Sequence, residues 1–174
     1  MPLSIAADVA AAAPAAPAPP TEGDDANARD AVYFEGLGNG ILYSVNYERF
    51  LPRYNLGLRG GASFITYKVS SASGSGNLTF ATWPLVVSYY WGLPRHKLQL
   101  GLGATILYFD ASSDSTGTKI EGAGTGFGVA ATAVIGYRYM PKNGGFTFGA
   151  GFTPLLRDPK GFLAWGGANA GFAF

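Results

Sequence analysis

Few residues of this 174-residue chain are of a type that could do chemistry. Cysteine is absent, which removes thiolate nucleophiles, disulfides and zinc sites built on sulfur. His96 is the only histidine, and it stands between basic neighbours in Pro94-Arg-His-Lys97, with no carboxylate beside it to help hold a metal ion. We interpret His96 as a solvated turn residue. The sequence predicts no catalytic residue, no metal site and no cofactor.

A glycine-rich run, Gly122–Gly128 (GAGTGFG), superficially resembles a phosphate-binding loop. A phosphate site of that kind needs a strand before the glycines and a helix after them, so that the helix N-terminus meets the phosphate. No such unit follows this run, and we expect no nucleotide site. The formal net charge of +1 likewise offers no electrostatic case for binding nucleic acid.

The more informative polar residues are four ionisable groups inside otherwise apolar, alternating segments: Glu35, Glu48, Arg59 and Arg138. Alternation places Glu48, Arg59 and Arg138 on the polar face of their segments. Charges enclosed in a dry interior must pair, because an unpaired buried ion is very costly. We favour a salt-bridged network that closes the interior. A polar gate in a narrow channel is the alternative, and a register shifted by one residue would turn every side chain to the other face.

Glu48 and Arg59 are the first candidates for partners in this network. They lie on either side of the turn Pro52–Tyr54 at nearly equal distances from it. Antiparallel neighbours bring such positions side by side, where opposite charges stabilise each other. The sequence therefore predicts a Glu48–Arg59 pair, with Arg138 or Glu35 as the other possible partners.

Composition indicates which elements hold these groups. Hydrophobic residues make up 48% of the chain and charged residues only 13%, about half the usual share of a soluble domain. No stretch is long and apolar enough for a transmembrane helix. Apolar residues instead alternate with small or polar ones in eight segments, which predict antiparallel strands. These segments are 31–37, 41–51, 55–68, 77–91, 97–110, 127–140, 145–153 and 162–174.

The connections and the faces favour a barrel in a membrane. Tight turns (52–54, 92–96 and 141–144) alternate with looser loops (70–76, 111–118 and 154–161), and Gly38-Asn39-Gly40 is a tight turn after the first, short strand. The polar face carries Gly, Ser, Thr, Asn and Gln rather than Lys and Glu. Aromatic residues gather near strand ends, as in membrane-interface girdles. We predict an all-β, transmembrane, antiparallel up-and-down β-barrel of eight strands over residues 31–174.

Residues 1–30 have a different composition. Residues 10–20 are almost entirely Ala and Pro, which predicts a disordered tail on the periplasmic side. Small residues near Ala6 and Ala7 are placed as at a signal-peptide cleavage site. One hypothesis is that the start codon lies upstream and that this stretch is a signal-peptide remnant; an ordinary disordered N-terminus is the other.

Residues 31–174 resemble the small eight-stranded outer-membrane barrels of the OmpA-transmembrane, OmpX and OmpW-like group. The resemblance rests on the strand pattern, the alternating loops and the terminal Phe172-Ala-Phe174, which looks like the assembly signal of that class. It implies a Gram-negative outer-membrane protein with periplasmic termini. Its implied partners are membrane lipid, lipopolysaccharide and the barrel-assembly machinery.

We expect a non-enzymatic barrel with a structural or interaction role through its external loops. A narrow channel or lateral transporter for small or hydrophobic molecules is the alternative function. A lipid-modifying outer-membrane enzyme is the third, and it would need a serine or carboxylate within reach of His96.

Overall fold

The computed structural model describes residues 28–71, 74–113, 124–158 and 161–174. Residues 1–27 of the predicted N-terminal tail and residues 114–118 of the loop predicted at 111–118 lie outside these residues. The described elements are, in chain order, β1 Asp30–Leu37, η1 Gly38–Gly40, β2 Tyr43–Leu51, η2 Pro52–Tyr54, β3 Leu56–Ser71, β4 Gly74–Gly92, β5 His96–Ser113, β6 Thr125–Tyr139, β7 Gly145–Phe152, β8 Leu155–Asp158, β9 Gly161–Leu163 and β10 Gly166–Ala173.

Eight of these strands close into a barrel. Each of β1 to β6 pairs with the next strand in antiparallel register, β7 pairs with β10, and β10 pairs with β1. At the seam, the amides of Asp30 and Phe174 each donate to the carbonyl of the other, at 3.0 and 2.8 Å. The predicted all-β, antiparallel, eight-stranded barrel is confirmed. Among the described residues, no helix is long and apolar enough to cross a membrane.

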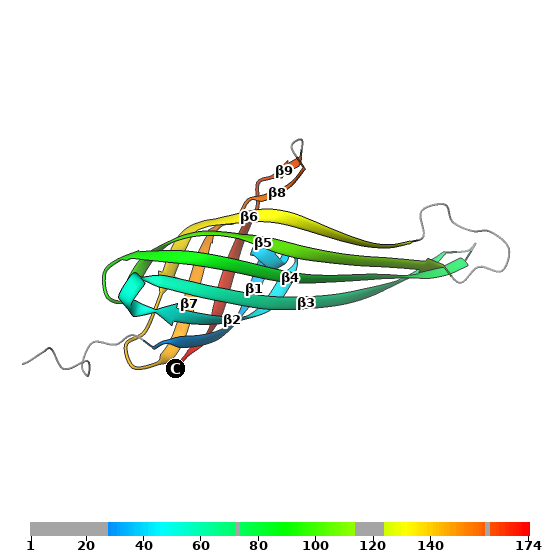
Figure 1. Cartoon of the computed structure of the whole chain (residues 1–174). Coiled ribbons are helices and arrows are strands. Elements are labelled where there is room, and N and C mark those ends of the chain that lie inside the picture. The colour runs from blue at the N-terminus through cyan, green and yellow to red at the C-terminus, as the bar shows by residue number, and fades with distance from the viewer. Residues whose placement is uncertain (1–27, 72–73, 114–123, 159–160) are drawn as a thin grey trace, which may run out of the picture.

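The two ends of the barrel differ. One end, called here the terminal end, holds Asp30, Phe174, η2 and the turns between β4 and β5 and between β6 and β7. The other, called the loop end, holds η1, the β3–β4 and β5–β6 connections and the β8–β9 hairpin. Strands β3 to β6 run 15–19 residues, whereas the other barrel strands have 8 or 9. The long strands therefore project beyond the rest of the wall at the loop end (Figure 1).

The last connection is more ordered than the sequence indicated. We predicted a loop over 154–161 and a final strand from Phe162, but β8 and β9 form a hairpin and β10 starts only at Gly166. Leu155 opposes Leu163 and Leu156 opposes Phe162, so apolar pairs hold both faces of the hairpin. Leu155 also pairs with Thr132 of β6, which ties the hairpin to the wall.

Side chains around the barrel body follow the predicted alternation. Outward positions are apolar and exposed, including Val45, Leu85, Val87, Leu102 and Ile135. Inward positions are buried and mostly polar: Glu35, Ser44, Asn46, Glu48, Arg59, Ser63, Thr82, Ser88, Lys97, Gln99, Thr105, Thr132 and Arg138. An apolar belt around a polar interior is the arrangement that a lipid-facing barrel requires.

This polarity reverses on the projecting part of β3 to β6. By strand parity, Tyr67, Leu78 and Phe109 lie on the inward face there, and each is at least 40% exposed. On the outward face, the hydroxyls of Thr66 and Thr79 are hydrogen-bonded at 3.2 Å, and Thr125 donates to Asp110 at 2.6 Å. The outward face is thus polar on the projecting part of the strands. The apolar belt therefore ends there, on the side of the loop end.

Candidate functional site: the barrel interior

Two ion pairs lie inside the barrel. Arg59 of β3 contacts Glu35 of β1 at 3.1 Å, and Arg138 of β6 contacts Glu48 of β2 at 3.3 Å. All four side chains are at most 3% exposed. The four ionisable residues singled out in the sequence therefore lie together in the interior, as two carboxylates and two guanidinium groups of balanced charge.

Glu48 is the centre of the network near the terminal end. Its carboxylate accepts hydrogen bonds from the hydroxyls of Tyr33, at 3.1 Å, and of Tyr90, in addition to its contact with Arg138. The Arg138 guanidinium lies 4.0 Å from the centre of the Tyr33 ring and donates to the Asn169 side chain at 2.7 Å. Five strands thus contribute to one cluster, and each charge has more than one partner, as buried charges require.

The predicted Glu48–Arg59 pair is wrong, although its register is right. The two residues are direct cross-strand partners of β2 and β3. Their charged groups nevertheless turn to other strands, Glu48 to Arg138 and Arg59 to Glu35. An eight-stranded barrel is narrow enough for side chains to meet across its interior. Partners across the lumen therefore compete with the neighbour on the adjacent strand.

The turn between β1 and β2 folds into the barrel instead of extending from its rim. Asn39 of η1 is completely buried. Its side-chain amide donates to Thr132, its side-chain oxygen accepts from Arg59, and its backbone carbonyl accepts from Thr105 at 2.8 Å. Thr82 donates to the next carbonyl, that of Gly40, at 3.2 Å. This inward turn, called the plug below, is therefore held by β3, β4, β5 and β6 together.

The backbone of the plug is unusual. Leu37 and Ile41, which flank it, have φ values of 61° and 72°, in the left-handed region that apolar L-residues rarely adopt. Such strain persists only where the surroundings compensate for it. The hydrogen bonds of Asn39 and Gly40 supply that compensation. The sequence prediction of a tight turn here is correct, but its burial was missed.

Apolar side chains cover the plug on the side of the loop end. Leu107, Ala130 and Leu155 form a buried cluster, and Ile41, Phe80 and Trp165 pack against it. These six side chains are called the cap below. The Trp165 indole donates to the Ile41 carbonyl at 3.1 Å, which connects the cap to the end of the plug. The interior is thus polar through the barrel body and apolar above the plug.

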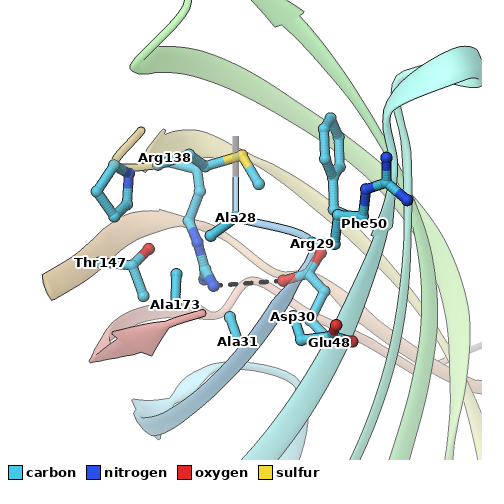
Figure 2. Close-up of a pocket in the computed structure, with 11 residues that line it drawn as sticks. Ala28, Arg29, Asp30, Ala31, Glu48, Phe50, Arg138, Thr147 and Ala173 are labelled. Atoms are coloured by element: carbon cyan, nitrogen blue, oxygen red, sulfur yellow. Dashed lines mark ion pairs between the residues drawn. The ribbon is translucent and has the colours of Figure 1, made fainter. Parts of the chain in front are cut away.

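At the terminal end, a small cavity of about 10 Å³ lies beside the Glu48–Arg138 pair (Figure 2). This is room for about one water molecule. Ala28, Phe50, Met140, Thr147 and Ala173 are among the residues that line it. The pair is therefore enclosed by side chains on this side too.

The other residues considered in the sequence lie outside the interior. His96 is exposed at the start of β5, and its Nδ1 lies 2.7 Å from the Tyr137 hydroxyl. Phe172 and Phe174 are both exposed, and Phe174 closes the seam through its backbone. The assembly role of these two residues stays a prediction. Among the described residues, no group of three or more histidine or acidic side chains could hold a metal ion.

The chain has the fold of small eight-stranded outer-membrane β-barrels. It is similar to the N-terminal β-barrel domain of Pseudomonas aeruginosa OprF, with a TM-score of 0.56 and 18% identity over 86% of this chain and 100% of that one. It is also similar to Ail, the attachment invasion locus protein of Yersinia pestis, in complex with the heparin analogue sucrose octasulfate. There the TM-score is 0.50 and the identity 12%, over 83% of this chain and 96% of that one. No protein-family model and no curated protein matches the chain.

Proposed function

We propose that this protein is a closed, non-enzymatic outer-membrane barrel that presents its loop end as a structural or interaction surface. The observation that carries the proposal is the way the interior is filled. The plug is anchored to four strands, two buried ion pairs lie below it, and an apolar cap lies above it. These contacts across the lumen support the proposal that ions have no continuous path through the barrel.

The apolar belt and the likeness to outer-membrane barrels support the location. The terminal end carries only short turns, whereas the longest connection between described strands, from Ser113 to Thr125, lies at the other end together with the projecting strands. Outer-membrane barrels keep their short turns in the periplasm and their longer loops outside. The proposal therefore places both ends of the barrel segment in the periplasm and the projecting strands at the cell surface. Lipid, lipopolysaccharide and the barrel-assembly machinery are its expected partners.

Conductance tests the closed interior. Purified protein in a planar lipid bilayer is expected to show no steady ion current. Asn39→Gly removes the side chain that links the plug to Arg59 and Thr132, so this variant is expected to show intermittent small openings. Asn55→Gly is a matched change in the exposed turn at the terminal end, and this variant should show no ion current. A steady current through the unmodified protein would overturn the proposal.

A lateral passage for hydrophobic molecules is the second candidate, and one observation favours it. Beyond Ala62, β3 is no longer paired with β2, whose last contact with it is the hydrogen bond from the Tyr43 hydroxyl to the Phe64 carbonyl. The inward face of the projecting strands is apolar and exposed above the cap. A hydrophobic molecule entering there could leave sideways into the membrane without crossing the plug. Uptake of a hydrophobic dye by vesicles that contain the protein but conduct no ions would favour this second function.

The membrane location predicts a strong effect of charge on the apolar belt. Val87, on β4, is outward-facing and exposed. Val87→Arg is expected to lower the free energy of unfolding in lipid by about 2–4 kcal/mol if the residue lies near the bilayer midplane. Urea titration in lipid vesicles, followed by tryptophan fluorescence, measures this loss. A neutral effect, or a protein that stays soluble without detergent, would contradict the location.

A further inference from the structure

Two shallow depressions, together called the groove below, lie one after the other on the outside of the barrel along β5, starting at the terminal end. Its first part, of about 460 Å³, is lined by Trp91, Leu93, Leu98 and Tyr137, among others. Its neighbour, of about 500 Å³, is lined by Tyr89, Leu100 and Leu102, among others. Leu98, Leu100 and Leu102 share the outward face of β5, so the two parts follow one another along the strand. The groove therefore lies on the proposed lipid-facing wall.

The terminal end around this groove is basic. Its described charged residues outside the interior are Arg29, Asp30, Arg49, Arg53, Arg95 and Lys142. Asp30 is the single acidic side chain of this set, and it is paired with Arg49 at 3.0 Å. Arg53 and Arg95 form no ion pair with a described residue. The projecting strands have two charged residues with described side chains, Lys68 and Asp110, and their charges are by contrast balanced.

Aromatic and apolar side chains stand among these basic residues. Trp91 and Leu93 are 67% and 66% exposed, and Tyr54 lies beside Arg53, whose guanidinium is 5.7 Å from the ring centre. Amphipathic aromatic rings favour the level of lipid headgroups, and basic residues there attract anionic lipids. The start of the groove and the basic residues of the terminal end thus lie at the same level of the barrel, where the proposed location places the lipid headgroups.

We propose that this groove binds an anionic diacyl phospholipid. Its phosphate lies at Arg95, which directly precedes His96 of the groove lining. One acyl chain follows Leu98, Leu100 and Leu102, a run of about 13 Å at about 3.3 Å per residue. Arg53 adds a second positive charge from the neighbouring turn. The site rests on the proposed membrane location, and it would select a lipid of the leaflet at the terminal end.

Lipid enrichment tests this site. The full chain is placed in nanodiscs of phosphatidylcholine with a minor fraction of phosphatidylglycerol, and the lipids retained by the protein are counted by native mass spectrometry. Phosphatidylglycerol is expected to be enriched over its bulk fraction. Arg95→Gln and Arg53→Gln should each reduce the enrichment about fivefold. Ala133→Phe, which fills the groove without changing charge, should also reduce it.

The matched control is Lys68→Gln on the projecting strand β3, which removes one exposed positive charge far from the groove and should leave the enrichment unchanged. Equal enrichment in the unmodified protein and in Arg95→Gln, or none at all, would overturn the site. Heat-dependent migration in gel electrophoresis reports separately on the folded barrel. A barrel that inserts without lipid selectivity refutes the site alone, whereas one that fails to insert refutes the membrane location.

Discussion

Arg138→Met is expected to lower the free energy of unfolding by about 3–5 kcal/mol, the largest loss for a side chain of the interior. The substitution leaves the Glu48 carboxylate buried without its ionic partner. It also removes the cation over the Tyr33 ring and the donor to Asn169. Glu48→Gln combined with Arg138→Met removes both charges, so the double variant should recover part of the loss. Urea titrations in lipid vesicles give the four free energies of this double-mutant cycle.

A second cycle, on Glu48 and Arg59, is the control. These residues are cross-strand neighbours but do not contact each other's charged groups. Their coupling should be smaller than that of Glu48 with Arg138 or of Glu35 with Arg59, for which we expect about 1–3 kcal/mol. The largest coupling in the Glu48/Arg59 cycle would show that the pairs across the interior are not those described above.

Gly171→Ala is expected to prevent normal closure of the barrel. Gly171 of β10 opposes Tyr33 of β1 at the seam. A Cβ atom at this position would lie 2.2 Å from the Val32 carbonyl oxygen and 2.4 Å from the Tyr33 Cα, so the backbone of one strand must move. Overpacking usually costs about 1–3 kcal/mol, and a clash with backbone lies at or above the upper end of that range. The variant should lose the heat-dependent gel migration of a closed barrel.

Gly36→Ala provides the matched control on the same seam. A Cβ atom there would meet its nearest neighbours, the Phe34 ring and the Ala168 carbonyl oxygen, at 3.8 and 4.0 Å, which is ordinary contact. The free energy of unfolding should change little. Equal behaviour of the two alanine variants would show that Gly171 is not needed for the approach of β1 and β10.

Periodicity was sufficient to predict the wall of the barrel. Side chains along a strand point to opposite faces in turn, so every second residue shares a face. This rule correctly assigned Glu48, Arg59 and Arg138 to the interior. It could not assign their partners, because those depend on which strands face each other across the lumen. Sequence spacing describes adjacent strands only.

The plug was missed for a related reason. Gly38-Asn39-Gly40 has the composition of a tight turn, and nothing local distinguishes an exposed turn from one that enters the barrel. The signal that could have revealed it is the length of the predicted strand 31–37, the only predicted strand that is shorter than the about 9–11 residues that a spanning strand needs. A strand that ends too early places its turn below the rim. The sequence prediction also missed the hairpin β8–β9, because the proline and charged residues of this segment are typical of loops.

The seam between β1 and β10 has a consequence for how this protein folds. Ala31 pairs with Ala173, so closure joins the two ends of the barrel segment. Asn39 contacts Thr132, 93 positions away, so the plug must be in place when the wall closes around it. Contacts between residues so distant in sequence slow folding, because the loss of chain entropy precedes any gain. We expect an all-or-none final step of docking and closure, before which an incomplete chain exposes two unpaired strand edges.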